Sequence, residues 1–319
     1  MPKLAELATS VIVLGVSLAA LSFASRYVIR YVEDLIEITG FGETSIGFAL
    51  LSVITSIPEL TVAIFAIMDG SPSLSIGDLL GSNVFNIGVV VGILMLTSGF
   101  LKECPEGLDE LADILILASI IPLILVVLKV PELLLGFGLL SIFVLTVYKE
   151  TRTRTLKPLP DQVSEKKRGP ISMILLKILG GTLVVVLSAR FAVSSALEIA
   201  FSFAVAPIVV GALIVAFGTS LPELSLSLTA VKRGRIRLAS ANAIGSNLTN
   251  LTLILGLVLL SSLFSPFRLD ITAFSEIISF VLITSLIIWY HMTKGADCRL
   301  VGISLISTYI IFQVNTILR

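Results

Sequence analysis

The sequence predicts an all-α polytopic membrane protein, with ten transmembrane helices arranged as two inverted five-helix repeats. The 319 residues are 56% hydrophobic and 14% charged, with a mean hydropathy of +1.06, which lies outside the range of soluble globular domains. Ten apolar stretches are each long enough to cross about 30 Å of hydrocarbon as a helix of about 20 residues. A third observation, an internal repeat at one fixed offset, predicts the two halves.

The ten stretches predict the helices in chain order. The first lacks a basic leader beyond Lys3 and is longer than the apolar region of a secretory signal, so we expect it to be a retained span. None alternates in polarity as the strands of a membrane β-barrel do. Their approximate bounds are 8 to 32, 44 to 68, 75 to 99, 110 to 128, 131 to 148, 171 to 194, 204 to 231, 238 to 262, 271 to 290 and 299 to 317.

Basic residues predict the orientation in the membrane. Seven Lys or Arg lie between Lys149 and Arg168, and a second basic cluster lies between Lys232 and Arg237. Since basic loops stay in the cytoplasm, we expect both clusters inside the cell and both termini outside it. The predicted units are a first membrane repeat at 1 to 148, a cytoplasmic linker loop at 149 to 169 and a second, inverted repeat at 170 to 319.

An offset of 164 residues superimposes the two halves without a gap. TSIPEL at 55 to 60 then meets TSLPEL at 219 to 224, and GSNVFN at 81 to 86 meets GSNLTN at 245 to 250. Because each half carries five spans, an odd number, the second half enters the membrane upside down relative to the first. Inverted repeats are typical of secondary transporters, whose substrate site lies near the midplane where interrupted helices meet.

Glu59 and Glu223 are acidic residues inside predicted spans, at equivalent positions of the repeat. A carboxylate in the bilayer costs at least about 2.5 kcal/mol on insertion scales. A duplicated pair therefore indicates function better than a protonated Glu that bonds to a neighbouring helix. Pro58 and Pro222, each one residue earlier, remove a backbone donor and free a carbonyl oxygen in the preceding turn. Such oxygens are tolerated only beside a cavity or a partner.

Hydroxyl groups lie one helical turn before each Glu, at positions i−4 and i−3 that share its helix face. With two carboxylates and freed carbonyls they make an all-oxygen ligand set, which suits Ca²⁺ with its roughly 6 to 8 oxygen ligands. Two Glu charges neutralise one divalent ion, and the lack of His and Cys disfavours zinc and copper. The hydroxyl residues are Thr55, Ser56, Thr219 and Ser220.

The two GSN motifs open the spans that follow each Glu-bearing segment. Asn86 and Asn250 can supply side-chain carbonyl oxygens or hold the Glu side chains. Ser82 and Ser246 are interpreted with equal weight as ligands or as helix-packing residues. The glycine of each motif permits close approach of helix backbones.

Four further residues are interpreted as structural or solvent-exposed and not as parts of the ion site. Asp78, whose repeat mate is Asn242, is interpreted as an interfacial cap rather than part of a proton or ion path. His291 is interpreted as a solvated loop residue. Cys104 and Cys298 match no metal or redox spacing, so we interpret them as plain thiols and expect no cofactor.

The chain carries two copies of TS(I/L)PE, and in each copy the closing Asn of GSNxxN follows 27 residues after the Glu. These paired motifs resemble the alpha repeats of the calcium/cation antiporter superfamily, specifically its sodium/calcium exchanger branch in archaea and bacteria. The resemblance covers the whole chain in span number and inverted halves. It implies a core of spans two, three, seven and eight, with long tilted spans one and six that slide to open the site to each side in turn. It also implies residue roles: Glu59 and Glu223 as central Ca²⁺ ligands, Thr55, Ser56, Thr219 and Ser220 at Na⁺ sites, and Asn86 and Asn250 completing the centre.

Three departures from the family pattern bear on the counter-ion. Ile54 stands where the family usually has Gly before TS, both GSNxxN copies end in Asn where some members have Asp, and Asp78 replaces the usual Asn of GNxxGSN. With only two carboxylates at the centre, two protons could displace one Ca²⁺. The TS hydroxyls, which proton/calcium relatives tend to lack, favour Na⁺ instead.

The sequence therefore predicts a secondary-active antiporter, not an enzyme, that exchanges Ca²⁺ for Na⁺ or, as the alternative, for H⁺. Its expected partners are these ions and the lipid bilayer of the cell membrane. The oligomeric state stays open, a monomer included, and zero net charge gives no reason to expect nucleic acid. Two remote alternatives are an intramembrane aspartyl protease, suggested by Gly77-Asp78 without a second intramembrane Asp, and a passive cation channel, for which no symmetric pore loop is evident.

Overall fold

The protein is described here by a computed structural model. In the part of the chain that it describes, the secondary structure consists of helices and no strands. The described residues are 2–39, 53–98, 108–128, 130–153, 170–232, 236–264, 266–267, 270–295 and 297–318.

The membrane-spanning character of the chain is evident from its helices. Eight of the described helical segments are long and apolar enough to cross a membrane, and two shorter apolar helices, Ile57–Met68 and Ala112–Ile124, fall at the second and fourth predicted spans. The chain is thus an all-helical, multi-pass membrane protein. The count of ten spans and the inverted repeat stay predictions at this point.

The helices of the first half follow the predicted spans in order. They are α1 (Pro2–Thr39), α3 (Ile57–Met68), α4 (Pro72–Phe85), the π-helix η2 (Asn86–Val91), α5 (Gly92–Ser98), α6 (Leu108–Leu128) and α7 (Glu132–Thr153). The beginning of the second predicted span, up to residue 52, lies outside the described residues.

The helices of the second half are more often interrupted. They are α8 (Ile171–Phe203), α9 (Pro207–Val210), the π-helix η3 (Gly211–Val215), α10 (Ala216–Thr219), α11 (Leu221–Lys232), α12 (Ile236–Thr249), the π-helix η4 (Asn250–Ile254), α13 (Leu255–Leu260), the 3₁₀ turn η5 (Ser261–Leu263), α14 (Ile271–Lys294) and α15 (Cys298–Ile317).

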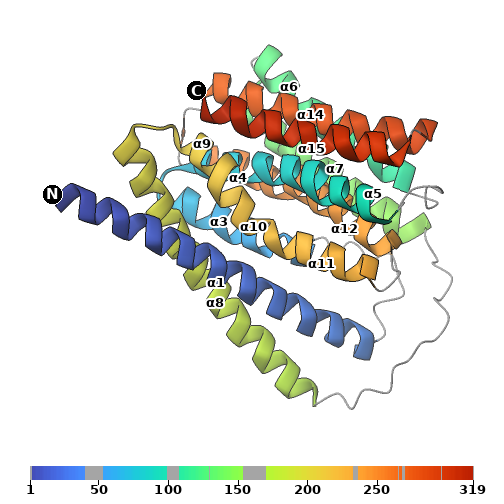
Figure 1. Ribbon diagram of the computed structural model, residues 1–319, viewed down its shortest axis with the longest axis horizontal. Coiled ribbons are helices and arrows are strands. Elements are labelled where there is room, and N and C mark those ends of the chain that lie inside the picture. Colours follow the sequence, from blue (N-terminus) through green and yellow to red (C-terminus); the bar gives the residue numbers. More distant parts are fainter. Residues whose placement is uncertain are drawn as a thin grey trace.

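The helices form a buried centre between two outer groups. The segments Pro72–Leu96 and Asn242–Leu263 are the most buried of the eight spans. On one side α1 and α8 pack against each other, and on the opposite side lie α6, α7, α14 and α15 (Figure 1). Large apolar side chains such as Val144, Phe191 and Leu300 are exposed on these outer helices. A surface rich in large apolar side chains is suited to contact with lipid.

The first and sixth spans are longer than predicted. α1 has 38 residues and α8 has 33. At about 1.5 Å per residue, each is longer than the hydrocarbon core is thick, so both helices extend beyond it or tilt across it. Their length agrees with what the family resemblance implies for these two spans.

The central helices cross at glycines. A Cβ atom added at Gly77 would lie 2.0 Å from the carbonyl oxygen of Ile208, and one at Gly81 would lie 2.4 Å from that of Ala212. No side chain fits at either place, so α4 packs backbone to backbone against α9 and η3. The interpretation of Gly81 as a close-packing residue is confirmed.

The solvated-loop interpretation of His291 is wrong. α14 continues through this residue to Lys294 and ends at Gly295, whose φ of 67° is the left-handed conformation that favours glycine. The His291 side chain is 3% exposed, and its Nε2 lies 4.0 Å from the Sγ of Cys298 at the start of α15. The charged and glycine-containing stretch after it is the helix end and the short link, not a loop that includes the histidine.

Candidate ion-binding site

Both TS(I/L)PE segments interrupt a helix at their serine. Ser56 is a turn residue that precedes α3, and Ser220 separates α10 from α11. Pro58 and Pro222 then lie in the first turn of the new helix, where the missing N–H has no intrahelical acceptor to lose. The backbone N–H four residues after each serine donates to the serine carbonyl, at 3.0 Å for Ser56 and 3.2 Å for Ser220. The sequence thus places each Glu in the first turn of a restarted helix.

The two glutamates are fully buried. Glu59 and Glu223 are each 0% exposed, and within the described residues none of their four carboxylate oxygens has a hydrogen-bond partner. Glu59 interacts electrostatically with Glu223 and with Asp78. A buried carboxylate without a partner carries a desolvation cost of several kcal/mol. The pair therefore requires a cation or protons.

Two hydroxyl contacts join the halves of the chain. The Oγ1 of Thr55 lies 2.9 Å from the Oγ of Ser246, and the Oγ1 of Thr219 lies 3.2 Å from the Oγ of Ser82. The two contacts are equivalent, because the 164-residue offset maps Thr55 onto Thr219 and Ser82 onto Ser246. Each contact connects the TS segment of one half with the GSN motif of the other, so the four motifs meet at one place.

Asn86 and Asn250 each begin a π-helical segment, η2 and η4. Both are 0% exposed, and both ends of each side-chain amide lack a hydrogen-bond partner in the described part of the chain. The neighbouring Asn247 donates from Nδ2 to the carbonyl oxygen of Asn83 at 2.9 Å, which ties the two GSN motifs together. π-turns inside α-helices occur frequently at functional sites, and nothing in the sequence pattern predicted these two.

All ten predicted site residues are therefore buried. Ser56 and Ser220 are 1% and 0% exposed, with no hydrogen-bond partner for either Oγ among the described residues. In the same part of the chain, no three His, Cys, Asp or Glu side chains gather into a metal centre. A cation bound here would need hydroxyl, amide or backbone oxygens in addition to the two carboxylates. Such a ligand set is all oxygen and suits a hard cation.

The interfacial-cap interpretation of Asp78 is wrong. Asp78 lies in the middle of α4 and is 0% exposed, and the Thr219 hydroxyl donates to its Oδ1 at 2.9 Å. It interacts electrostatically with both Glu59 and Glu223. The signal that could have found it is helical spacing, because Asp78 shares one face of the helix with Ser82, four residues later.

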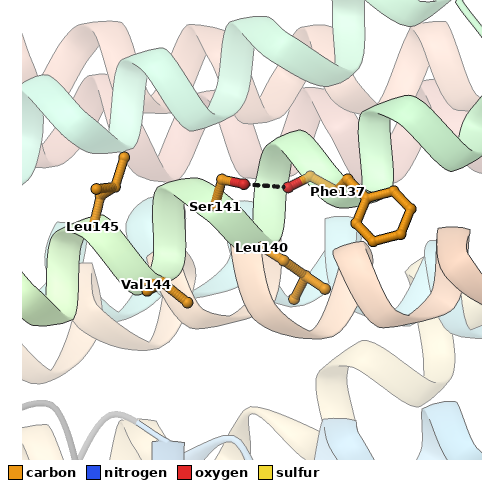
Figure 2. Close-up of a pocket in the computed structure, with 5 residues that line it drawn as sticks. All are labelled: Phe137, Leu140, Ser141, Val144 and Leu145. Carbon is orange, nitrogen blue, oxygen red and sulfur yellow. Dashed lines mark hydrogen bonds between the residues drawn. The ribbon is translucent and has the colours of Figure 1, made fainter.

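The surface groove in Figure 2 is a separate feature. It has a volume of about 370 Å³ and is lined by Phe137, Leu140, Ser141, Val144 and Leu145, all from α7. The one hydroxyl in it already donates to the Phe137 carbonyl at 2.8 Å. It offers a cation no charged ligand.

Comparison with known proteins agrees with this architecture. The family described as "Sodium/calcium exchanger protein" matches residues 9–150 and 173–318. Over 300 residues the chain is 28% identical to the Inner membrane protein YrbG of Escherichia coli, which covers 88% of this chain and 87% of that protein. Over 343 residues it is 25% identical to the Sodium/calcium exchanger MaX1 of Methanosarcina acetivorans, covering 95% of this chain and 97% of that one.

The fold also matches a solved structure. The crystal structure of the H⁺/Ca²⁺ exchanger CAX superimposes with a TM-score of 0.77 at 17% identity, over 97% of this chain and 86% of that chain. At this identity the likeness concerns the fold. Because the family match covers most of the sequence, in both halves, the protein belongs to the sodium/calcium exchanger family.

Proposed function

We propose that the protein is a secondary-active antiporter that exchanges Ca²⁺ for Na⁺ at the site formed by the four motifs. The observation that carries the proposal is the pair of fully buried glutamates, Glu59 and Glu223, with no partner for their carboxylate oxygens in the described residues. Two negative charges balance one Ca²⁺. The buried Asn86 and Asn250 amides and the serine hydroxyls beside the glutamates supply further oxygens.

Coupled exchange, and not uncoupled transport of one ion, follows from the unfavourable free energy of the empty site. Without an ion, two unpaired buried carboxylates would have to stay in the membrane while the protein changes between its inward and outward states. Either Ca²⁺ or the competing cation removes this cost, and both need the same ligands. The protein then crosses between states only when loaded, which makes transport of one ion depend on the other.

The moving part in this proposal is the pair α1 and α8. The two long helices pack mainly on each other and contact the site helices through α3, α10 and α11. A Cβ atom at Gly218, one residue before the TS segment, would lie 2.8 Å from the Leu18 side chain of α1. Sliding of this pair would therefore act directly beside the site.

The inverted repeat of two five-helix halves belongs to the same proposal. Its support is the pair of equivalent cross-contacts, Thr55 with Ser246 and Thr219 with Ser82. With the cytoplasmic linker at 149 to 169, the repeat sets both termini outside the cell, as the distribution of basic residues favours.

The choice of Na⁺ as counter-ion rests on the hydroxyl groups. The relative MaX1 is a sodium/calcium exchanger by name and CAX an H⁺/Ca²⁺ exchanger, so kinship alone does not decide. Protons can bind to the two glutamates alone. The hydroxyl groups of Thr55 and Thr219, by contrast, are neutral oxygen ligands of the kind that Na⁺ uses. H⁺ is the alternative counter-ion.

The test is uptake of radioactive Ca²⁺ into proteoliposomes that contain the purified full-length chain. We expect uptake with an outward Na⁺ gradient at equal pH and none above background with an outward proton gradient in the absence of Na⁺. Uptake driven by protons alone would replace Na⁺ by H⁺ in the proposal. Uptake that needs no counter-ion on the opposite side would indicate a channel and contradict exchange.

A further inference from the structure

We propose that Asp78 strengthens the Na⁺ site at Thr219 and Ser82, so that the two halves of the binding centre, which both offer hydroxyl ligands for Na⁺, differ in charge and in affinity for Na⁺. This inference rests on the proposed function and deepens it. It assigns the extra carboxylate, which stands where the family pattern has a neutral Asn, to the binding of the counter-ion.

Three contacts define the site. The Thr219 hydroxyl donates to the Oδ1 of Asp78 at 2.9 Å and lies 3.2 Å from the Ser82 Oγ. The other carboxylate oxygen, Oδ2, is buried and has no hydrogen-bond partner within the described chain. All three side chains are 0% exposed. A buried carboxylate oxygen that no donor of the described residues satisfies calls for a proton, a water molecule or a cation.

The hydrogen count leaves lone pairs for a cation. A hydroxyl has one hydrogen to donate. Thr219 places its hydrogen on Asp78, since its approach to the Ala216 carbonyl is longer, at 3.3 Å. With Ser82 donating to Thr219, lone pairs of both hydroxyls and the Oδ2 of Asp78 are available to a cation within the described residues. One carboxylate and two neutral oxygens match the single charge of Na⁺ better than the double charge of Ca²⁺, which takes more oxygen ligands.

The other half of the centre lacks this charge. The equivalent hydroxyl pair, Thr55 and Ser246, has Asn242 at the position that corresponds to Asp78. Asn242 is 1% exposed, and neither end of its amide has a partner in the described residues. A neutral amide attracts a cation far less than a carboxylate does in a low-dielectric interior. The protein therefore binds one monovalent cation on the Asp78 side more strongly than on the Asn242 side.

The decisive variant is Asp78→Asn, which keeps the shape and makes both halves neutral. In proteoliposomes of the full-length chain, we expect the Na⁺ concentration for half-maximal Ca²⁺ uptake to rise at least about tenfold and the Hill coefficient for Na⁺ to fall by about one. Exchange of Ca²⁺ for Ca²⁺ without Na⁺ should fall less than Na⁺-driven uptake at the wild-type half-maximal Na⁺ concentration, because the glutamate pair stays intact. Asp270→Asn removes a carboxylate at an exposed helix N-cap and should change none of these three quantities.

Unaltered Na⁺ dependence in Asp78→Asn would overturn the site. Should this variant fail to fold, Asn242→Asp is the test: a carboxylate beside Thr55 should lower the half-maximal Na⁺ concentration several-fold, and an unchanged or higher value contradicts the inference. Wild-type Ca²⁺/Ca²⁺ exchange distinguishes failure of the proposed function from failure of the Asp78 site. Its absence would sink the proposed function itself, whereas its presence with unaltered Na⁺ dependence in the variants sinks only the Asp78 site.

Discussion

Replacing Glu223 by Gln is expected to abolish Ca²⁺ transport, with the initial rate of uptake falling at least about a hundredfold. The substitution keeps the size of the side chain and removes one of the two buried charges that would balance the ion. Leaving a buried charge without its partner costs about 3 to 5 kcal/mol, and each 1.4 kcal/mol is about tenfold in affinity. Ca²⁺ uptake into proteoliposomes under the Na⁺ gradient measures the effect directly.

The same loss is expected for Glu59→Gln, because the two residues are equivalent under the repeat and both are fully buried. Glu132→Gln is the matched control: this acid lies in the first turn of α7 and belongs to none of the four motifs, and the variant should transport at the wild-type rate. Near-normal exchange in either Glu59→Gln or Glu223→Gln would refute a site built on the two glutamates.

The four motifs could be singled out from the sequence as one candidate site because the repeat is exact in spacing. Transporters with inverted repeats have their substrate site where interrupted helices meet, so the two TS segments and the two GSN motifs were expected at one site. The structure brings them together through the contacts of Thr55 with Ser246 and of Thr219 with Ser82, but the pairing of TS in one half with GSN in the other was not predicted. The π-helical turns at Asn86 and Asn250 could not be predicted, since they arise from how the packed helices fit and not from a local residue preference.

Asp78 was misplaced because hydropathy gives the ends of a span only approximately. Near a span end, an acid is normally solvated or caps a helix, and the sequence offered no sign of what lies over it. What covers Asp78 is the second half of the chain, through Thr219 and through the close approach of Gly211 to its backbone. A contact between residues more than a hundred positions apart is set by tertiary packing, which a single sequence does not display.

His291 was misplaced for a related reason. Thr293, Lys294 and Gly295 next to it have a loop-like composition, yet the helix continues to Lys294 and Gly295 terminates it. Helix ends are governed by the cap and not by average polarity.

Gly211→Ala is expected to have the second large effect, on stability and on transport together. A Cβ atom there would lie 2.1 Å from the carbonyl oxygen of Leu74 and 2.9 Å from the backbone nitrogen of Asp78. Both atoms belong to the backbone of α4, so no side-chain rotation relieves the clash and the two helices must separate. Overpacking typically costs about 1 to 3 kcal/mol, and a clash with main chain lies at the upper end of this range.

Thermal unfolding in detergent is measured as the fraction of protein that stays monodisperse at each temperature. The midpoint of this transition should be several degrees lower for Gly211→Ala than for wild type. Gly138→Ala is the matched control, because a Cβ there meets nothing within 4 Å, and Ala favours a helix over Gly by about 1 kcal/mol. Its midpoint should equal or exceed that of wild type. Equal midpoints for all three proteins would contradict the backbone contact between α4 and η3.

The contact also positions the site. Separating α4 from η3 moves Asp78 away from Thr219, so Gly211→Ala should weaken the Na⁺ dependence of Ca²⁺ uptake in the fraction of protein that still folds.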